Sequence, residues 1–246
     1  MTYEVIEEWI GDFLLETGAL PATDWVRYPQ EQRRWGITWA ELQALKLLPL
    51  EKIPNLIASD SAVVVTAGTI LVDALPDKLF EPIDIWAPIG TPAVNYHWTK
   101  ITADKTRFMH NLNMANGLYW YWKNTSVLGA AVLLDPSLEI TIGQGQQRQI
   151  VLLTGGGLVV PATVNMLYKS YPTSYAESGG FDDGETPPSY FSCPFEGEEH
   201  TLALGAAAWC LLQDNDPRWK DLLQTFAGLL GVQTDVILGS VKEVRK

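Results

Sequence analysis

The sequence predicts an α+β protein: helices at both ends of the chain form a helical bundle, and an antiparallel β-barrel or β-sandwich is inserted between them. Three observations support this prediction. Both ends carry apolar residues at the three-and-four spacing of amphipathic helices. The middle alternates apolar and polar residues in short runs, with turn residues at nearly every junction. A breaker-rich acidic stretch then leads into a helix of small residues near the C-terminus.

The N-terminal part is expected to contain two helices. The first spans residues 3–17, with Val5 and Trp9 on its apolar stripe. The second is predicted to begin at a capping box formed by Thr38 and Glu41, in which each side chain satisfies a backbone N–H of the first turn. Prolines after this second helix are expected to close the helical region.

From about residue 55 the period of the sequence changes to two, which is typical of strands. Residues 62–66 and 69–73 are expected to pair as a hairpin across Ala67-Gly68. Further strands are predicted at residues 82–87, 96–101, 117–122, 129–134, 138–142, 149–153 and 158–168. Many short strands separated by turn residues favour an antiparallel barrel or sandwich over alternating strands and helices.

The C-terminal part is expected to hold a long exposed loop followed by two helices. Glycines, prolines and aspartates predict the loop at residues 170–195, and the first helix is expected at 197–213. Asp216-Pro217 supplies an N-cap and a first-turn proline for the last helix. Its apolar residues recur at steps of four and three, a seam that indicates a partner helix. Unbroken to the C-terminus, this helix would be about 45 Å long, and three glycines could interrupt it: Gly228, Gly231 and Gly239.

These elements divide the chain into four parts. They are an N-terminal helical part at residues 1–54, an antiparallel β domain at 55–169, a long acidic loop at 170–196 and C-terminal helices at 197–246. The C-terminal helices are expected to pack with the N-terminal helical part.

Composition argues against several classes of function. The chain has 17 Lys+Arg against 29 Asp+Glu, and a surface with a net charge of −12 repels phosphate, so sequence-specific DNA binding is not expected. The N-terminus is acidic where a signal peptide is basic, and no uncharged apolar run approaches the ~20 residues that span a bilayer. Cys193 and Cys210 match no zinc spacing, and no disulfide is expected. We expect a soluble protein made in the cytoplasm.

No motif indicates an enzyme or a cofactor. The run 143–148 lacks the third glycine of a dinucleotide loop, and the run 154–157 lacks the Lys-Ser/Thr of a phosphate loop, so both favour turns. The three histidines are far apart and follow no nucleophile pattern: His97, His110 and His200. We therefore expect no catalytic residue and no cofactor.

Acidic residues are concentrated between Lys169 and Arg218, where the chain has no Lys or Arg. The acids around Gly184 lack the alternating order of a calcium loop, so no metal is expected. The stretch is interpreted as a solvated surface, a docking face for a basic partner, or the wall of a channel through which DNA slides. The residues assigned to the channel or docking face are Glu177, Asp182, Asp183, Glu185, Glu196, Glu198 and Glu199.

One strand is unusually aromatic, at Tyr119-Trp120-Tyr121-Trp122. Alternation would place the two tyrosines on one face of the sheet and the two tryptophans on the other. Such a strand is either part of the core or a stacking platform for sugars or bases.

The order of these elements and two local runs resemble the head-to-tail adaptor proteins of tailed bacteriophages, including the tail tubular protein A group of short-tailed phages. One run is 67–76, at the first strands. The other is 195–217, in which an acidic cluster opens a small-residue helix and an Asp-rich turn with proline follows. The resemblance covers about residues 60–80 and 160–226, and the loop at 170–195 and the aromatic strand depart from it.

The resemblance implies a virion protein of the neck, between capsid and tail. Such adaptors form a ring, commonly of twelve copies, in which the C-terminal helices contact the portal protein and the β part faces a tail or nozzle protein. DNA passes through the ring without sequence-specific binding, and no membrane is involved. The residues assigned to portal docking are Trp219, Leu223, Phe226, Leu230, Ile237, Val241 and Val244.

Two other functions remain compatible with the residues. The β domain could present tyrosine and tryptophan side chains to a carbohydrate on a phage tail or a cell surface. A hydrolase could use the scattered carboxylates, although sequence does not show two of them facing each other across a cleft. The adaptor is the first expectation, and no enzyme activity is expected.

Overall fold

A computed structural model gives the fold of the chain. It describes residues 3–16, 27–76, 78–101, 117–124, 148–154, 158–172 and 193–237. The chain forms two compact units, a helical unit from Met1–Leu56 and Tyr171–Lys246 and a β unit from Ile57–Ser170. The predicted α+β class is confirmed.

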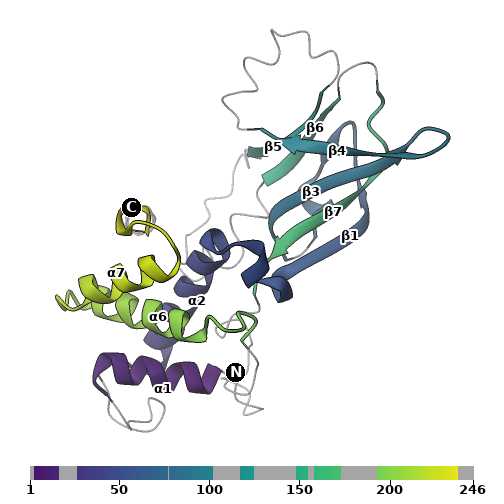
Figure 1. The fold of residues 1–246 in the computed structure, drawn as a ribbon. Coiled ribbons are helices and arrows are strands. Elements are labelled where there is room, and N and C mark those ends of the chain that lie inside the picture. Colours follow the sequence, from purple (N-terminus) through teal and green to yellow (C-terminus); the bar gives the residue numbers. More distant parts are fainter. Residues whose placement is uncertain are drawn as a thin grey trace. The chain divides into compact units, whose positions relative to one another are not determined.

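The helical unit is built around one central helix. Its helices are α1 (Tyr3–Leu14), α2 (Gln30–Leu47), α6 (Glu199–Gln213) and α7 (Trp219–Leu229), with short 3-10 turns η1 (Leu50–Lys52) and η2 (Pro54–Leu56) after α2. α6 packs against α1, α2 and α7 (Figure 1). Segments from both ends of the chain therefore share one core.

Small residues allow the helices around α6 to approach closely. A Cβ atom at Gly36 of α2 would lie 2.7 Å from the backbone oxygen of Ala206. A Cβ atom at Gly205 of α6 would lie 2.7 Å from the ring of Phe226. Because real Cβ contacts are never this short, glycine is required at both positions by the packing.

The predicted start of the second helix is wrong. α2 begins at Gln30, directly after Pro29, and Thr38 and Glu41 are buried inside it. The carboxylate of Glu41 accepts a hydrogen bond from the hydroxyl of Tyr3 on α1. A capping box marks a helix start only where the preceding residues do not continue the helix, and here they continue it.

The last helix ends near Gly231, one of the three glycines that were expected to interrupt it. α7 ends at Leu229, and Gly231 adopts φ 74°, the left-handed conformation that commonly ends a helix. The backbone N–H of Val232 then donates to the oxygen of Ala227 at 3.0 Å. A single long helix is therefore not formed, and residues after Ile237 lie outside the described part.

The β unit is one curled sheet of seven strands, in the order β1-β7-β3-β4-β5-β6-β2 (Figure 1). The strands are β1 (Ile57–Val64), β2 (Thr69–Ile70), β3 (Leu79–Ile89), β4 (Val94–Lys100), β5 (Leu118–Asn124), β6 (Arg148–Thr154) and β7 (Thr163–Ser170). Every strand contributes buried side chains to one apolar cluster. A closed barrel or a two-sheet sandwich is not confirmed.

The sheet is mixed and not purely antiparallel, which corrects the prediction. β4 and β5 run parallel, with Thr99 opposite Tyr119, while the other described pairs are antiparallel. Parallel neighbours need a connection of a dozen residues or more, and the chain between Lys100 and Leu118 is long enough to supply it. Turn residues alone did not reveal this crossover.

The turn predicted at Ala67-Gly68 forms, but the hairpin around it does not. Both residues have positive φ, 49° and 78°, and Thr66 and Thr69 exchange two backbone hydrogen bonds of 2.8 and 2.9 Å. Beyond this bridge β1 pairs with β7 and β2 pairs with β6. The turn therefore links the two edge strands of the curled sheet.

Five predicted strands coincide with observed ones, with shifted ends. β3, β4, β5, β6 and β7 overlap the predictions at 82–87, 96–101, 117–122, 149–153 and 158–168. The predicted strands at 129–134 and 138–142, and most of the predicted loop at 170–195, lie outside the described residues.

Candidate docking surfaces

The apolar residues assigned to portal docking lie mainly inside the helical unit. Four are buried: Leu223, Phe226, Leu230 and Ile237. Trp219 is half-buried, and the last two lie outside the described residues: Val241 and Val244. The side chains that form the seam thus offer little surface to another protein in this structure.

Aromatic stacking explains what covers the seam. Trp39 of α2 is stacked on Trp209 of α6, with ring centroids 5.3 Å apart and an angle of 24° between the planes. The same ring contacts Phe226 of α7 at 5.7 Å. The partner that the seam pattern indicated is therefore the unit's own core.

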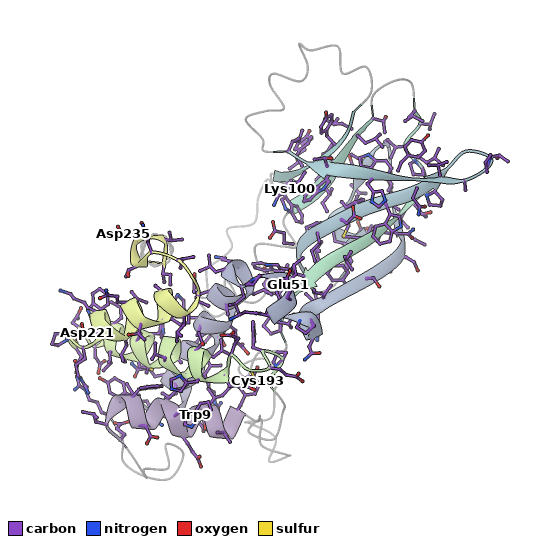
Figure 2. The ribbon with its side chains drawn as sticks, in the orientation of Figure 1. Trp9, Glu51, Lys100, Cys193, Asp221 and Asp235 are labelled. Carbon is purple, nitrogen blue, oxygen red and sulfur yellow. The ribbon has the colours of Figure 1, made fainter. Side chains whose placement is uncertain are left out.

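His200 joins α6 to α1 through ring contacts. Its ring centroid lies 5.6 Å from that of Trp9 and 5.3 Å from that of Phe13, both in an edge-on arrangement. Trp9 is labelled on α1 in Figure 2. The contacts assign His200 a packing role between the two helices.

Acidic residues between Lys169 and Arg218 form ion pairs with basic residues from distant parts of the sequence. Lys52 Nζ lies 2.5 Å from Glu198 Oε1, although the two residues are 146 positions apart. Arg27 Nε lies 3.2 Å from Asp214 Oδ2, across 187 positions. Some of the acids between Lys169 and Arg218 are therefore neutralised by ion pairs, and the number of unpaired acids in this unit is smaller than the sequence suggests.

Asp216 and Arg218 form a bidentate pair at the start of α7. Arg218 donates from Nε and Nη2 to the two carboxylate oxygens at 3.0 and 2.9 Å, and its backbone N–H donates at 3.1 Å. These bonds lower the pKa of Asp216 to about 2. Asp216 thus orders the turn into α7, and the helix itself begins at Trp219.

The residues assigned to the acidic channel are only partly placed. Glu196 is exposed, Glu198 is half-buried in its ion pair and Glu199 is buried. The remaining four lie outside the described residues: Glu177, Asp182, Asp183 and Glu185. The channel or docking face therefore stays a prediction.

A buried arginine was missed by the sequence analysis. Arg33 of α2 is 1% exposed and donates to the carboxylate of Glu16 at 2.6 Å and to the backbone oxygens of Tyr28 and Glu7 at 3.0 and 3.3 Å. A buried charge of this kind is retained only when it is paired. The one available signal is that Arg33 lies four positions before the buried Ile37, on the apolar face of α2.

Both cysteines are buried free thiols of the helical unit. Burial raises the pKa of Cys193, which is labelled in Figure 2, and of Cys210 to about 12. Cys210 Sγ lies 3.6 Å from the backbone oxygen of Gln32. Thiols in this state are protonated at neutral pH and are poor nucleophiles.

The aromatic strand β5 divides its side chains as alternation predicts. Trp120 is 1% exposed and meets Trp122 edge-on at 6.1 Å in the core of the sheet. Tyr119 and Tyr121 lie on the opposite face and are half-buried. Lys100, labelled in Figure 2, places Nζ 5.5 Å from the centre of the Trp120 ring. Trp120 is a core residue, Trp122 is partly buried and packs against the core, and the two tyrosines lie on the other face.

A polar and aromatic cluster lies on the outer face of β3 and β4. His97 Nδ1 is 2.8 Å from Asp84 Oδ2, and the His97 ring is stacked on Trp86 at 6.2 Å. These side chains point away from the core side, which holds Ile85 and Trp98. Sequence analysis treated His97 as isolated, because cross-strand pairing was unknown.

Among the residues that the structure describes, no three His, Cys, Asp or Glu side chains gather into a possible metal site. No helix in the same ranges is long and apolar enough to cross a bilayer. Asp182, Asp183 and Glu185, weighed above as cation ligands, lie outside these ranges.

Comparison with models of protein families found no family that matches this chain, and comparison with curated proteins found no match either. Function is therefore inferred from the residues and contacts of this chain.

Proposed function

We propose that this chain is a structural virion protein, a head-to-tail adaptor that forms a ring between portal and tail and lets DNA pass. The observation that carries the proposal is the position of residues 195–217, the run with the clearest resemblance to adaptors. Its helix α6 is the centre of the helical unit and contacts α1, α2 and α7. The segment that resembles adaptors thus contains the central helix, against which helices from both ends of the chain pack.

The division into two units supports this role. The chain enters the β unit after Leu56 and leaves it after Ser170, so the curled sheet is an insertion in the helical unit. We propose that this sheet acts as a barrel-like domain inserted in a helical bundle. Because each unit has its own core, each can bind a different neighbour in a layered assembly.

In this proposal the portal contact uses exposed positions near the buried seam. Leu229 at the end of α7 is 46% exposed, and Val236 shortly after it is 55% exposed. Exposed large apolar residues are common where proteins contact one another. The docking surface therefore lies beside Leu223 and Phe226, which stay in the core.

The charge of the chain supports passage of DNA without binding. A net charge of −12 repels the phosphate backbone, and this repulsion does not depend on base sequence. Since Asp214, Asp216 and Glu198 are paired with bases, the repulsion is assigned to the remaining acids.

Co-purification with the portal protein encoded by the same genome tests the proposal. The wild-type chain is expected to bind the portal ring, and Leu229→Asp and Val236→Asp are expected to weaken binding about tenfold or more each. Val94→Asp is the matched control, because Val94 is 54% exposed but belongs to the β unit. A wild-type chain that does not bind the portal would overturn the proposal.

A second candidate function, carbohydrate binding, is favoured by the outer face of the β unit. Trp86, His97 and Asp84 form one cluster there, and Tyr119 faces the same side from β5. Aromatic rings beside hydrogen-bonding groups are typical of sugar sites. Binding to a glycan array that Trp86→Ala abolishes would support this candidate, and an array without signal would remove it.

A further inference from the structure

Two charge-free segments of the chain meet in the β unit. Residues 61–72 and 149–168 contain no Asp, Glu, Lys or Arg, although 19% of the chain is charged. The backbone N–H of Val65 donates to Ala162 at 2.8 Å, and that of Leu152 donates to Gly68 at 2.8 Å. We name the meeting place, residues 64–71 and 158–163, the uncharged junction.

The uncharged junction exposes apolar side chains. Val159 is 82% exposed, Val64 is 54% exposed and Leu71 is 39% exposed. Neighbouring positions between them, including Ala67 and Ala162, are also exposed. Exposed apolar side chains within charge-free stretches of sequence are typical of binding surfaces, whose centres are depleted of charged residues.

Hydrogen bonds and core packing hold the backbone of the uncharged junction in place. The Ala67-Gly68 turn is closed by two backbone hydrogen bonds, and Thr154 Oγ1 donates to the backbone oxygen of Leu158 at 2.8 Å. Inward-pointing Val65 and Ile70 belong to the core cluster of the sheet. A frame held in this way reduces the entropy that binding must remove.

We infer that the uncharged junction is where one copy of this chain contacts a second copy. Nearly all of the net charge of −12 belongs to the helical unit, which has 21 Asp+Glu against 10 Lys+Arg, whereas the β unit has 8 against 7. The helical units of two copies therefore repel one another, and the β units do not. Contact between copies is therefore favoured where neither brings acids to the interface. A basic partner would instead be drawn to the acids of the helical unit, and DNA finds no Lys or Arg in residues 61–72 and 149–168 to pair with its phosphates.

The inference rests on the proposed function for its role, since an adaptor ring needs a contact between copies. An isologous contact between two junctions stops at a dimer. A heterologous contact, in which the junction meets another surface of the next copy, gives a ring when the rotation between copies closes, and an adaptor ring needs a contact of this kind. Because the contact is apolar and the opposing force is charge repulsion, self-association should become stronger as salt screens the charges.

Sedimentation velocity of the full chain over a range of protein and salt concentrations tests the inference. The average mass is expected to rise with protein concentration, and more steeply at high salt. Val159→Asp is expected to weaken association about tenfold or more, because it brings a carboxylate into the contact. Val94→Asp, at the first residue of β4 in the same unit, is the matched control and should associate like the wild type.

A labelled variant extends the test to an assembly that forms only on a portal. Val159→Cys gives one accessible thiol, since Cys193 and Cys210 are buried, and it accepts a benzophenone maleimide. Irradiation of the labelled chain on portal rings should give covalent dimers of this chain. Cross-links to another protein alone would overturn the inference.

Two further results would contradict it, and each can be separated from failure of the adaptor proposal. One is a chain that stays monomeric at every salt concentration and gives no covalent dimer on the portal. The other is equal weakening by Val159→Asp and Val94→Asp. If the chain binds the portal but copies do not associate through the junction, the inference fails and the adaptor proposal stands. If copies associate through the junction but do not bind the portal, the adaptor proposal fails and the inference stands.

Discussion

The helical unit and the β unit differ in how they use charged and apolar residues. In the helical unit, Arg33 is buried with Glu16, and Lys52 and Glu198 pair across 146 positions of sequence. In the β unit, the uncharged junction leaves Val159 exposed with no charged residue nearby in the sequence. The helical unit buries charged groups in long-range pairs, whereas the β unit exposes apolar side chains within two charge-free stretches of sequence.

This difference teaches where mutations should act on folding and where they should act on binding. Changes at the buried ion pair of the helical unit should lower its stability because they remove hydrogen bonds of a buried charge. Changes at its glycine contacts should do so because they force packed helices apart. Changes at the uncharged junction should leave stability nearly intact and alter association. Substitutions in both units test this division.

Arg33→Met should destabilise the helical unit most strongly. The change leaves Glu16 without its buried partner and frees two backbone oxygens, and removing one member of a buried pair costs about 3–5 kcal/mol. Urea unfolding followed by circular dichroism measures the loss. Lys46→Met, at an exposed lysine of the same helix, is the control and should change the free energy of unfolding by less than about 0.5 kcal/mol. Equal effects of the two variants would contradict the role given to Arg33.

Gly36→Ala should destabilise the same unit by about 1–3 kcal/mol, the usual range for overpacking. The new methyl group would lie 2.7 Å from the backbone of Ala206, so the α2–α6 contact has to open. Gly228→Ala makes the same chemical change in α7, where nothing lies within 4 Å of the new Cβ. Because alanine favours helix over glycine, Gly228→Ala should stabilise slightly. If both variants changed the free energy of unfolding in the same direction, close packing would not explain why position 36 holds glycine.

The Asp216 carboxylate should make a smaller, pH-dependent contribution. Its pKa in the folded chain is lowered to about 2 by Arg218, below the ordinary value of 3.8. A lowered carboxylate pKa gives stability that is fully present above about pH 4 and is lost as the pH falls towards 2. The melting temperature of Asp216→Asn should therefore lie below that of the wild type at pH 7, and the gap should close near pH 2.

Asp235→Asn is the control for this titration, because Asp235 is an exposed carboxylate of the same unit (Figure 2). Its melting temperature should follow that of the wild type across the range. A gap for Asp216→Asn that does not depend on pH would show that the Arg218 pair does not titrate as described.

Val159→Asp should have the smallest effect on folding, within about 0.5 kcal/mol, since surface substitutions rarely change stability more. Its side chain is 82% exposed, so the added carboxylate stays in water. Differential scanning calorimetry of dilute, monomeric protein measures this. A large loss of stability would mean that the uncharged junction is part of the core and not a binding surface.

Local sequence patterns predicted the helices and strands better than they predicted which elements pack against one another. The apolar spacing of residues 3–17 identified α1, and alternation separated Trp120 from Tyr119, of which the structure buries Trp120. Helix and strand periods report which face of an element is buried, because that depends on near neighbours in the sequence. They do not report what covers that face.

The misses follow from contacts between distant residues. Thr38 was given the role of a helix cap, whereas packing against α1 and α6 buries that stretch within a longer helix. The acids near residue 214 were counted without Arg27, which lies 187 positions away from its partner. The pairing of β1 with β7 also depends on tertiary structure. Four of the residues assigned to portal docking are therefore core residues of the helical unit: Leu223, Phe226, Leu230 and Ile237.

Cryo-electron microscopy of the viral particle made by the genome that encodes this chain tests the adaptor proposal most directly. We predict a ring of copies below the portal, with Leu229 and Val236 at the portal contact and the uncharged junction between neighbouring copies. Density for this chain at a tail tip, or its absence from the particle, would contradict the account and bring the Trp86, His97 and Asp84 face forward as the functional surface.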